Sequence, residues 1–479
     1  MSEYLRFIQR IGLVGLTNIL ISLSSLIFIP IITKSFTTAE YGMWAQVNTT
    51  IALVPNIANL GLPFTMVRFL SAEKDKDRIR ESFYPMMAVT FTSTIIICGF
   101  FIILGNPIAN SLFNGSMQVL YITTIISFFA CMNLMLISYF RTFQQMKRYS
   151  LYQILQSYIG VFVSIYLTYV GYPIETVVLG LLTGYVAVFL IMWIPILKYL
   201  GFGSVKWSNL KEQLEFAIPT IPSNVSSWVV DSSDKYVIGI FTGSIAVGCY
   251  SPGYALGSIL LMFLTPFAVL LPAVLPEPYE KGDIKQVDTY LNYSMKYYLL
   301  LTVPAAVGMS VLSKPLLLVI TTPEIALGGY MITPLVCLGA LFMGMYGITN
   351  NILILDKNTK LLGKLWIVVA ISNIVLNIIL VPYLGIIGAG FATLLCYILA
   401  FVVTAVASKK LMKLPFNLKE MLKIIIASGI MGSIIYLINP NGILGIILAI
   451  LVGVIVYFIV IFLLKGISKK EIQLFKDLI

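Results

Sequence analysis

The sequence predicts an all-α integral membrane protein with about 14 transmembrane helices. Hydrophobic residues make up 59% of the 479 positions and charged residues only 11%, whereas soluble domains carry about 25% charge. Apolar runs of roughly 20 residues, the length that crosses a bilayer, recur along the chain between charges, glycines and prolines. Basic residues separate these runs and form no patch in a soluble domain, so the net charge of +11 does not indicate nucleic-acid binding.

Fourteen segments meet this description. The first is too long for the apolar core of a secretion signal and lacks a small-x-small cleavage site, so we expect it to be retained. The loops at 383–385 and 439–441 are so short that the helices on either side must form tight hairpins. The predicted spans are 11–33, 42–67, 83–105, 117–140, 151–170, 176–197, 216–240, 244–275, 289–313, 331–355, 364–382, 385–408, 421–438 and 442–464.

The basic residues predict the orientation of these spans. With a cytoplasmic N-terminus, 27 of the 31 lysines and arginines fall in inner segments, and only Lys34 and Lys314 fall outside. Such an excess is the positive-inside signal of a multi-pass protein, here assigned to the cell (plasma) membrane. An even number of spans places both termini in the cytoplasm, and the tail 465–479 is expected to form a short basic amphipathic helix on the inner surface.

Two weak internal repeats predict a two-lobed organisation. The stretch 36–42, before the second span, is echoed by 241–248 before the eighth, and 73–77 is echoed by 280–283. The offsets of 205 to 207 residues separate an even number of spans, so the repeats should be parallel. The predicted divisions are an N-terminal lobe with spans one to six (1–213), a C-terminal lobe with spans seven to twelve (214–410), and two extra spans with a cytoplasmic tail (411–479).

The seventh predicted span carries charge where an ordinary span carries leucine. Asp231, Asp234 and Lys235 lie on one helical face, with Asp231 one turn from Lys235, where the two can pair. A charged side chain at membrane depth costs several kcal/mol unless it is paired or faces water. A salt bridge that locks two helices together is one interpretation. A site that lines a transport path is the other, and it is favoured because two acids share one base.

Counting 1.5 Å per residue places Asp231 close to the membrane midplane. A carboxylate left over after its neighbour pairs with Lys235 could bind Na⁺ or carry an exchangeable proton, so Asp231 and Asp234 are the predicted coupling-ion residues. No other cofactor and no metal site are expected. Histidine is absent, and the five cysteines fall in or at the edge of apolar runs without paired spacing.

Several motifs together resemble those of a known family. They are T-G-S-x-A-V-G-x-Y-S-x-x-Y from Thr242 to Tyr254, the Asp234-Lys235 pair upstream, Tyr279 to Asp283 after a proline-rich segment, and the segment from Ser372 to Gly390. These features resemble the polysaccharide flippases, O-antigen type, of the multidrug, oligosaccharidyl-lipid and polysaccharide exporter superfamily. The resemblance covers nearly the whole chain.

The resemblance implies a V-shaped pair of lobes around a central cavity. It implies movement of a polyprenyl-(di)phosphate-linked oligosaccharide from the cytoplasmic to the outer leaflet by alternating access, for cell-surface polysaccharide biosynthesis, with membrane lipids and glycan-assembly proteins as further partners. The peptidoglycan-precursor branch of this fold has an arginine near the middle of its first span. This chain has Gly15, Asn18, Ser22 and Ser25 there, which favours an O-antigen-like glycan.

Substrate-binding candidates follow from the chemistry of such a lipid. Its phosphates need cations, for which the candidates are Lys235, Lys296, Arg68 and Arg141. Snorkelling is the alternative for Lys296, only about 10 Å deep, and anchoring at the cytoplasmic surface is the alternative for both arginines. The glycan needs amide and hydroxyl groups, for which the candidates include Asn18, Asn48 and Asn350. Each of these amides could instead form an interhelical hydrogen bond.

Two other functions remain as alternatives. A cation-coupled multidrug exporter of the same superfamily would use acids within the membrane, as at Asp231 and Asp234, but the detailed motifs do not favour it. A polytopic membrane transferase is disfavoured because the chain lacks histidine and its outer loops hold only three acids. We therefore predict a transporter and not an enzyme. Prolines in the second, seventh and eighth spans predict helices that can bend.

Overall fold

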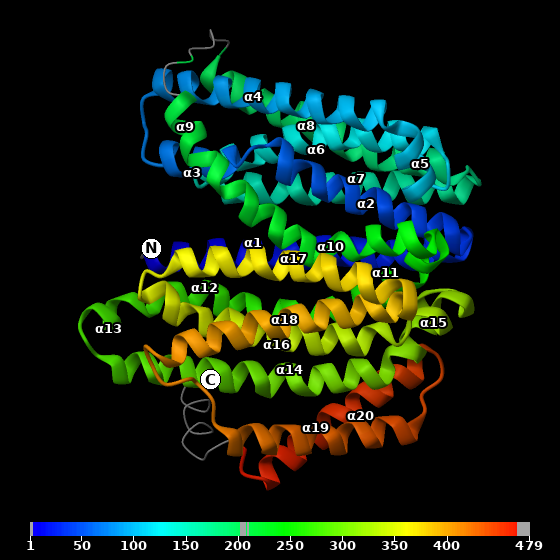
Figure 1. Ribbon diagram of the computed structural model, residues 1–479, viewed down its shortest axis with the longest axis vertical. Helices are drawn as coiled ribbons and strands as arrows, with labels where there is room; N and C mark the ends of the chain where they lie inside the picture. Colours follow the sequence, from blue (N-terminus) through cyan, green and yellow to red (C-terminus); the bar gives the residue numbers. More distant parts are fainter. Residues whose placement is uncertain (1–2, 202–206, 208–209, 467–479) are drawn as a thin grey trace. The chain divides into compact units, whose positions relative to one another are not determined.

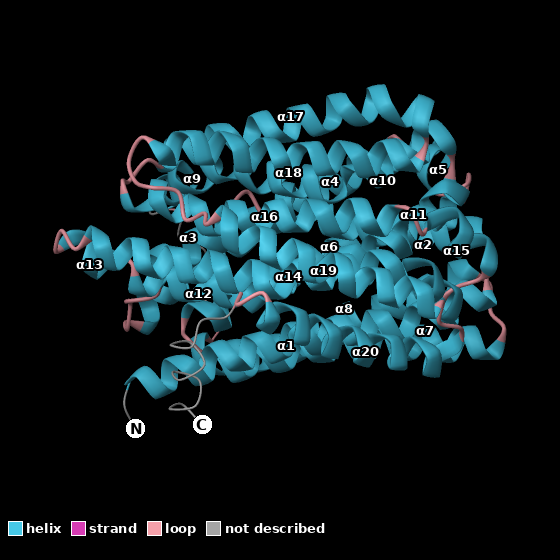
Figure 2. Ribbon diagram, turned by 90° about the horizontal axis from the view of Figure 1, so that it is seen from below, coloured by secondary structure: helices cyan, strands magenta, loops and turns pink. Residues whose placement is uncertain are grey.

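The computed structural model describes residues 3–201, 207 and 210–466, and within these ranges all regular secondary structure is helical (Figures 1 and 2). The all-α class is therefore confirmed. The predicted amphipathic helix at the C-terminus falls almost entirely outside the described residues. The chain divides into two compact units, Met1–Gly248 and Cys249–Ile479.

The first unit is a bundle in which the long helices α4, α6, α7 and α8 lie side by side (Figure 1). Its core is aromatic and sulfur-rich, and includes the fully buried side chains of Phe83, Met135 and Phe140. Its helices are α1 (Glu3–Ser35), α2 (Thr38–Ala58), α3 (Leu62–Leu70), α4 (Lys76–Ile103), α5 (Gly105–Leu112), α6 (Met117–Thr142), α7 (Met146–Val170), α8 (Ile174–Leu200), α9 (Leu210–Ala217), α10 (Ile221–Thr242) and the beginning of α11 (Ser244–Ser258).

In its described residues, the second unit contains the remainder of α11 and nine further helices. The two C-terminal helices dock on α14, where Tyr457 Oη donates a 2.8 Å hydrogen bond to the carbonyl oxygen of Leu300. A Cβ at Gly432 would lie 2.5 Å from Val307, so α19 approaches α14 closely. The helices are α12 (Thr265–Val274), α13 (Pro276–Glu280), α14 (Ile284–Ile320), α15 (Pro323–Gly329), α16 (Ile332–Leu355), α17 (Thr359–Leu384), α18 (Ile386–Lys409), α19 (Leu418–Ile438) and α20 (Gly442–Leu463).

Each of the fourteen predicted spans coincides with a helix or a broken helix. In the described residues, twelve helices are long and apolar enough to cross a membrane, and the bent pair α2 and α3 raises the number to thirteen. The remaining predicted span is α10. It falls short of the same criterion because Asp231, Asp234 and Lys235 lie within it. The predicted number of about 14 therefore agrees with the fold, and α10 stands out by its charge.

Polar caps explain where several of these helices begin. Thr37 Oγ1 accepts from the backbone N–H of Glu40 at 3.3 Å, and Glu40 Oε2 accepts from the N–H of Thr37 at 2.8 Å, a complete capping box before α2. Asp283 similarly accepts from the N–H of Gln286 at 3.0 Å before α14. These bonds satisfy backbone N–H groups that have no partner within the helix.

Helix breaks fall near the prolines that predicted them. The axis bends by 52° between α2 and α3, where Leu60 and Gly61 have φ of 49° and 76°. Glycine is suited to this left-handed conformation, and a Cβ at Gly61 would also overlap the carbonyl oxygen of Ala217. Two further breaks are 3₁₀ turns, Ile218–Thr220 between α9 and α10, and Ile259–Leu264 between α11 and α12.

The sequence repeat reappears as a symmetric helix crossing within the first unit. An offset of 206 residues aligns Thr38 with Ser244 and Gly42 with Gly248. A Cβ at Gly42 would overlap the carbonyl oxygen of Ser244, and a Cβ at Gly248 would overlap that of Thr38. In each copy of the motif, the glycine therefore leaves space for the backbone of the first helical residue of the other copy.

This crossing also bears on the division of the chain. Because α10 packs on α2, contacts group it with the first unit, whereas the repeat places it at the start of the second lobe.

We expect Gly42→Ala to lower stability, because the added methyl group must displace the backbone of Ser244. Overpacking of this kind costs about 1–3 kcal/mol, which for a chain of this size should lower the thermal unfolding midpoint in detergent by about 1–3 °C. Gly99→Ala in α4 is the matched control, since nothing lies within 4 Å of a Cβ there. Equal midpoints for the two variants would show that the crossing is not tight.

Candidate functional site

The charged helix α10 is held against α2 by polar contacts. Gln46 Nε2 donates to the carbonyl oxygen of Lys235 at 2.6 Å, and Thr50 Oγ1 lies 2.7 Å from Tyr236 Oη. Gly239 leaves the space that the Gln46 amide occupies, because a Cβ at this position would overlap Nε2. In a bilayer such bonds hold helices together where the hydrophobic effect cannot.

The three charged residues of α10 differ in exposure. Asp234 is completely buried, and its Oδ1 accepts from the backbone N–H of Lys235 at 2.8 Å. Lys235 is half-buried, and Asp231 is exposed one turn earlier. The helix is continuous from Ile221 to Thr242, so Asp231 and Lys235 keep the spacing that allows them to pair. Asp231 therefore lies at the surface of this helix, whereas Asp234 is enclosed by its neighbours.

An acceptor without a partner lies at the same helix contact. Gln46 is completely buried, and among the described residues its Oε1 has no hydrogen-bond partner. Its Nε2 already binds the backbone of Lys235, which links it to the charged segment. A buried acceptor that lacks a donor costs about 1–3 kcal/mol, and a cation or a hydrogen-bond donor at this place would remove that cost. Gln46 was not among the candidates predicted from the sequence, where it lies two residues before Asn48.

One of the two arginine candidates of the first unit lies over an aromatic ring. The guanidinium carbon of Arg141, at the end of α6, lies 5.7 Å from the ring centroid of Phe64 on α3. Phe64 is half-exposed, and Arg68 follows it by one helical turn and is exposed. In the described part of the chain neither arginine forms an ion pair, and Arg141 Nε is buried without a hydrogen-bond partner. We call these three residues the arginine cluster.

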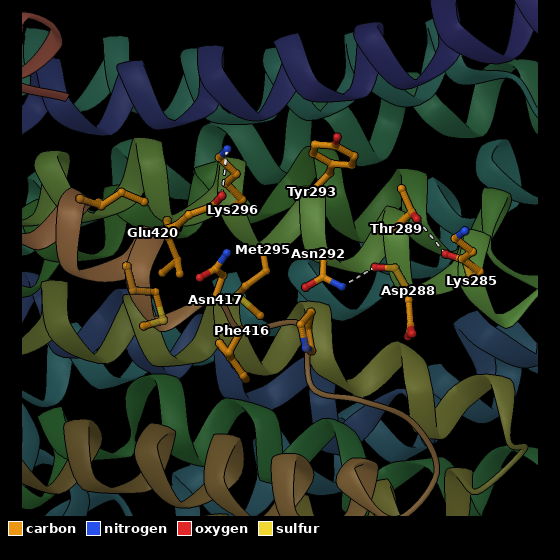
Figure 3. Close-up of a pocket in the computed structure, with 14 residues that line it drawn as sticks. Lys285, Asp288, Thr289, Asn292, Tyr293, Met295, Lys296, Phe416, Asn417 and Glu420 are labelled. Atoms are coloured by element: carbon orange, nitrogen blue, oxygen red, sulfur yellow. Dashed lines mark hydrogen bonds and ion pairs between the residues drawn. The ribbon is translucent and has the colours of Figure 1, made fainter. Parts of the chain in front are cut away.

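Lys296 lies elsewhere, in the second unit. Its Nζ is 3.4 Å from Glu420 Oε1 on α19, and its side chain is 11% exposed. It lines a cavity of about 480 Å³ between the N-terminal half of α14 and the beginning of α19 (Figure 3). Glu420 is 124 positions away along the chain, so spacing could not have revealed this partner. A role for Lys296 in phosphate binding stays a prediction.

The amide candidates fall into two groups. Asn18 is exposed on α1, and Ser22 and Ser25 follow on the same exposed face. Asn48 is exposed as well, although its Nδ2 donates to the carbonyl oxygen of Trp44 at 2.9 Å. Asn350 is half-buried and its Oδ1 accepts from Asn351 at 3.4 Å. Asn18 and Asn48 are therefore open to a ligand, and Asn350 less so.

Other amides serve the fold instead. Asn133 on α6 donates to Gln156 Oε1 and to the carbonyl oxygen of Tyr185, both at 2.9 Å, and so connects α6 to α7 and α8. Asn377 donates to the carbonyl oxygen of Asn373 within α17 at 2.9 Å. The bonds of Asn133 are interhelical, the alternative that the sequence left open, whereas the Asn377 bond lies within one helix. Within the described ranges, no three acidic or thiol side chains come together to hold a metal ion.

Comparison with known proteins places this fold and these helices in a family. The sequence model described as polysaccharide biosynthesis protein matches residues 7–275, more than half of the chain. A second model, MatE, matches residues 219–382. A solved structure of a lipid II flippase in an inward closed conformation superposes with a TM-score of 0.76 at 22% identity, covering 93% of this chain and 97% of that one.

Two curated relatives also carry flippase names. A low-salt glycan biosynthesis flippase of Haloferax volcanii is 22% identical over 278 residues, which is 57% of this chain and 58% of the relative. A lipid II flippase of Thermosipho africanus is 29% identical over 205 residues, which is 41% and 42% of the two chains. The chain spans about half the length of the curated relatives it matches. The family match confirms the resemblance that the motifs predicted, and the chain belongs to the polysaccharide biosynthesis protein family.

Proposed function

We propose that this protein moves a lipid-linked oligosaccharide from the cytoplasmic to the outer leaflet of the plasma membrane by alternating access, for cell-surface polysaccharide biosynthesis. The observation that carries the proposal is α10, a helix at membrane depth that keeps three charged residues in a chain of this family. Membrane proteins retain such residues at substrate and ion pathways. Flippase names among the relatives support the same activity.

The arginine cluster suits the phosphates of such a lipid. A guanidinium group presents donors in a planar fork that matches phosphate oxygens, and it keeps its charge. Arg68 is exposed, and the Nε of Arg141 still lacks an acceptor among the described residues. Lys235 would supply a third cation at greater depth. Lys296 would have to leave Glu420 before it could bind a phosphate. The exposed amides Asn18 and Asn48, with Asn350, would bind sugar hydroxyl groups.

A coupling ion would act at the contact of α10 with α2. Asp231 is exposed, whereas Asp234 is buried, as is Gln46 Oε1, which has no partner among the residues that the structure describes. Entry of Na⁺ or of a proton would neutralise a carboxylate here and change the cost of burying it. Such a change could favour one transport state over the other. The proposed activity is transport, with no covalent step.

A cation-coupled multidrug exporter is the second candidate. The match of the MatE model to residues 219–382, which includes α10, favours it. The two functions differ in their cargo, because a cationic drug is attracted to Asp231 and repelled by the arginine cluster. An anionic lipid has the opposite preference.

We expect Asp231→Asn and Lys235→Ala each to slow translocation of a fluorescent polyprenyl-diphosphate oligosaccharide at least tenfold in liposomes. Each change removes a charge that the proposal places on the transport path. Lys360→Ala is the control, since Lys360 is exposed at the start of α17. Translocation of the lipid at the wild-type rate in both charge variants would show that α10 does not line the transport path. A wild-type protein that exports cationic dyes but moves no lipid would be a drug exporter.

We also expect Arg141→Lys to raise the half-saturating concentration of the same lipid about tenfold, because an ammonium cannot bind a phosphate through a planar fork. The same exchange at Arg148, which is exposed and bound to Gln145 at 2.9 Å, should have no such effect. An equal response of both variants would show that the arginine cluster does not bind phosphate.

The proposed cytoplasmic position of both termini predicts which loops an impermeant maleimide can reach in intact cells. Tyr383→Cys, at a position 86% exposed in the last turn of α17, should be labelled from outside. Lys360→Cys should react only after the cells are opened. The five native cysteines are buried or half-buried, so background labelling should be low. Labelling of Lys360→Cys in intact cells would show that this loop lies outside the cell and would contradict the proposed cytoplasmic termini.

A further inference from the structure

The cavity beside Lys296 has features that transport of an oligosaccharide does not explain. It lies in the second unit, between α14, α19 and the short segment before α19 (Figure 3). The wall contributed by α14 begins with Lys285, one residue after the helix starts. The positive-inside pattern assigns this end of α14 to the cytoplasmic surface, where phospholipid headgroups lie.

The charges that line the cavity are balanced in number. Two are cations, Lys285 and Lys296, and two are anions, Asp288 and Glu420. Lys296 and Glu420 form an ion pair at 3.4 Å. Within the described residues, Lys285 and Asp288 form no ion pair, and Asp288 Oδ1 is buried without a hydrogen-bond partner. One cation and one anion therefore remain for a ligand, about one helical turn apart.

The beginning of α19 adds an environment that favours phosphate. Asn417 is the N-cap of this 21-residue helix, and its Oδ1 accepts from the N–H of Lys419 at 3.2 Å. Its amide nitrogen is then left to donate to an acceptor. The positive end of the helix dipole lies at the same place. The site thus has groups for a phosphate and, at Asp288, an acceptor for a hydrogen-bond donor.

The remaining lining suits the part of a lipid next to its headgroup. Leu299, Met421 and Ile424 give the cavity apolar surface, and Tyr293 and Phe416 add aromatic rings. Tyr293 is 45% exposed, and its ring is stacked on Tyr297 with centroids 6.0 Å apart. Aromatic rings of this kind are enriched at the headgroup level of membranes.

We propose that this cavity binds the headgroup of a phospholipid that carries both a phosphate and a primary ammonium, as in phosphatidylethanolamine. The ammonium donates to Asp288, and the phosphate accepts from Lys285 and from the Asn417 amide. A trimethylammonium headgroup has no N–H to donate to Asp288, and a purely anionic headgroup leaves the Asp288 carboxylate without a cationic partner. The bound lipid fills the space between α14 and α19. This inference does not depend on which cargo the protein moves.

The test is lipid retention measured by native mass spectrometry. Full-length protein is released from nanodiscs that hold equal amounts of phosphatidylethanolamine, phosphatidylcholine and phosphatidylglycerol. We expect at least fivefold preference for phosphatidylethanolamine. Asp288→Asn should abolish the preference and Asp288→Glu should keep it, because only the first removes the charge. Glu277→Gln is the control, since this exposed carboxylate pairs with Lys281 outside the cavity.

Three outcomes would overturn the proposal. They are equal retention of all three lipids by the wild type, a preference for phosphatidylglycerol, and a preference that survives Asp288→Asn in a protein with an unchanged melting temperature. Soluble phosphoethanolamine is added in a further arm. Displacement of the retained lipid at micromolar concentration would assign the cavity to a soluble ligand and would also overturn the proposal. Glu277→Gln must behave as wild type in every arm, and loss of preference in this control would equally refute a role specific to Asp288.

Discussion

The absence of water from the bilayer core is the constraint on which the rest of this structure depends. Each backbone N–H and carbonyl group must find a partner within the protein, and a helix supplies these partners within one segment. The described part of the chain accordingly contains helices as its only regular structure. The same constraint makes every charge at membrane depth costly, and α10 is the predicted span that carries three charged residues.

Close backbone approach determines how the first unit is assembled. Helices in a membrane gain little from the hydrophobic effect between them, so they associate where small residues let them touch. Gly42 and Gly248 do this at the crossing of the repeated motifs, and Gly239 does it where Gln46 reaches Lys235. The polar contacts of α10 therefore exist because glycines admit them, and a larger side chain would move the charged residues relative to α2.

Breaks in the helices lie close to these contacts. The left-handed residues Leu60 and Gly61 bend the second span, and Gly61 packs on the 3₁₀ turn that precedes α10. A 3₁₀ segment within a longer helix has weaker hydrogen bonds and often marks a hinge. Movement at this turn would be transmitted to Asp231, Asp234 and Lys235, since α10 continues from it without interruption.

The sequence by itself determined the class of the fold, the position of every span and the family. Apolar length, charge spacing and glycine or proline boundaries are local properties, and in a bilayer they decide where a helix begins and ends. The sequence also identified α10, because a charge within an apolar run is visible without any partner. It could not show that Asp234 is buried while Asp231 is exposed, since all three charges lie on one face of the helix.

Only the tertiary structure paired residues that are far apart in the chain. Gln46 with Lys235, Arg141 with Phe64, and Lys296 with Glu420 depend on which helices become neighbours. Which helices pack together is decided by contacts over whole helix faces, so a short sequence motif does not predict it. The cavity beside Lys296 is a further case, because its walls come from α14 and α19, more than a hundred residues apart. The charged residues of α14 can be assigned to a binding site only when the residues of α19 that face them are known.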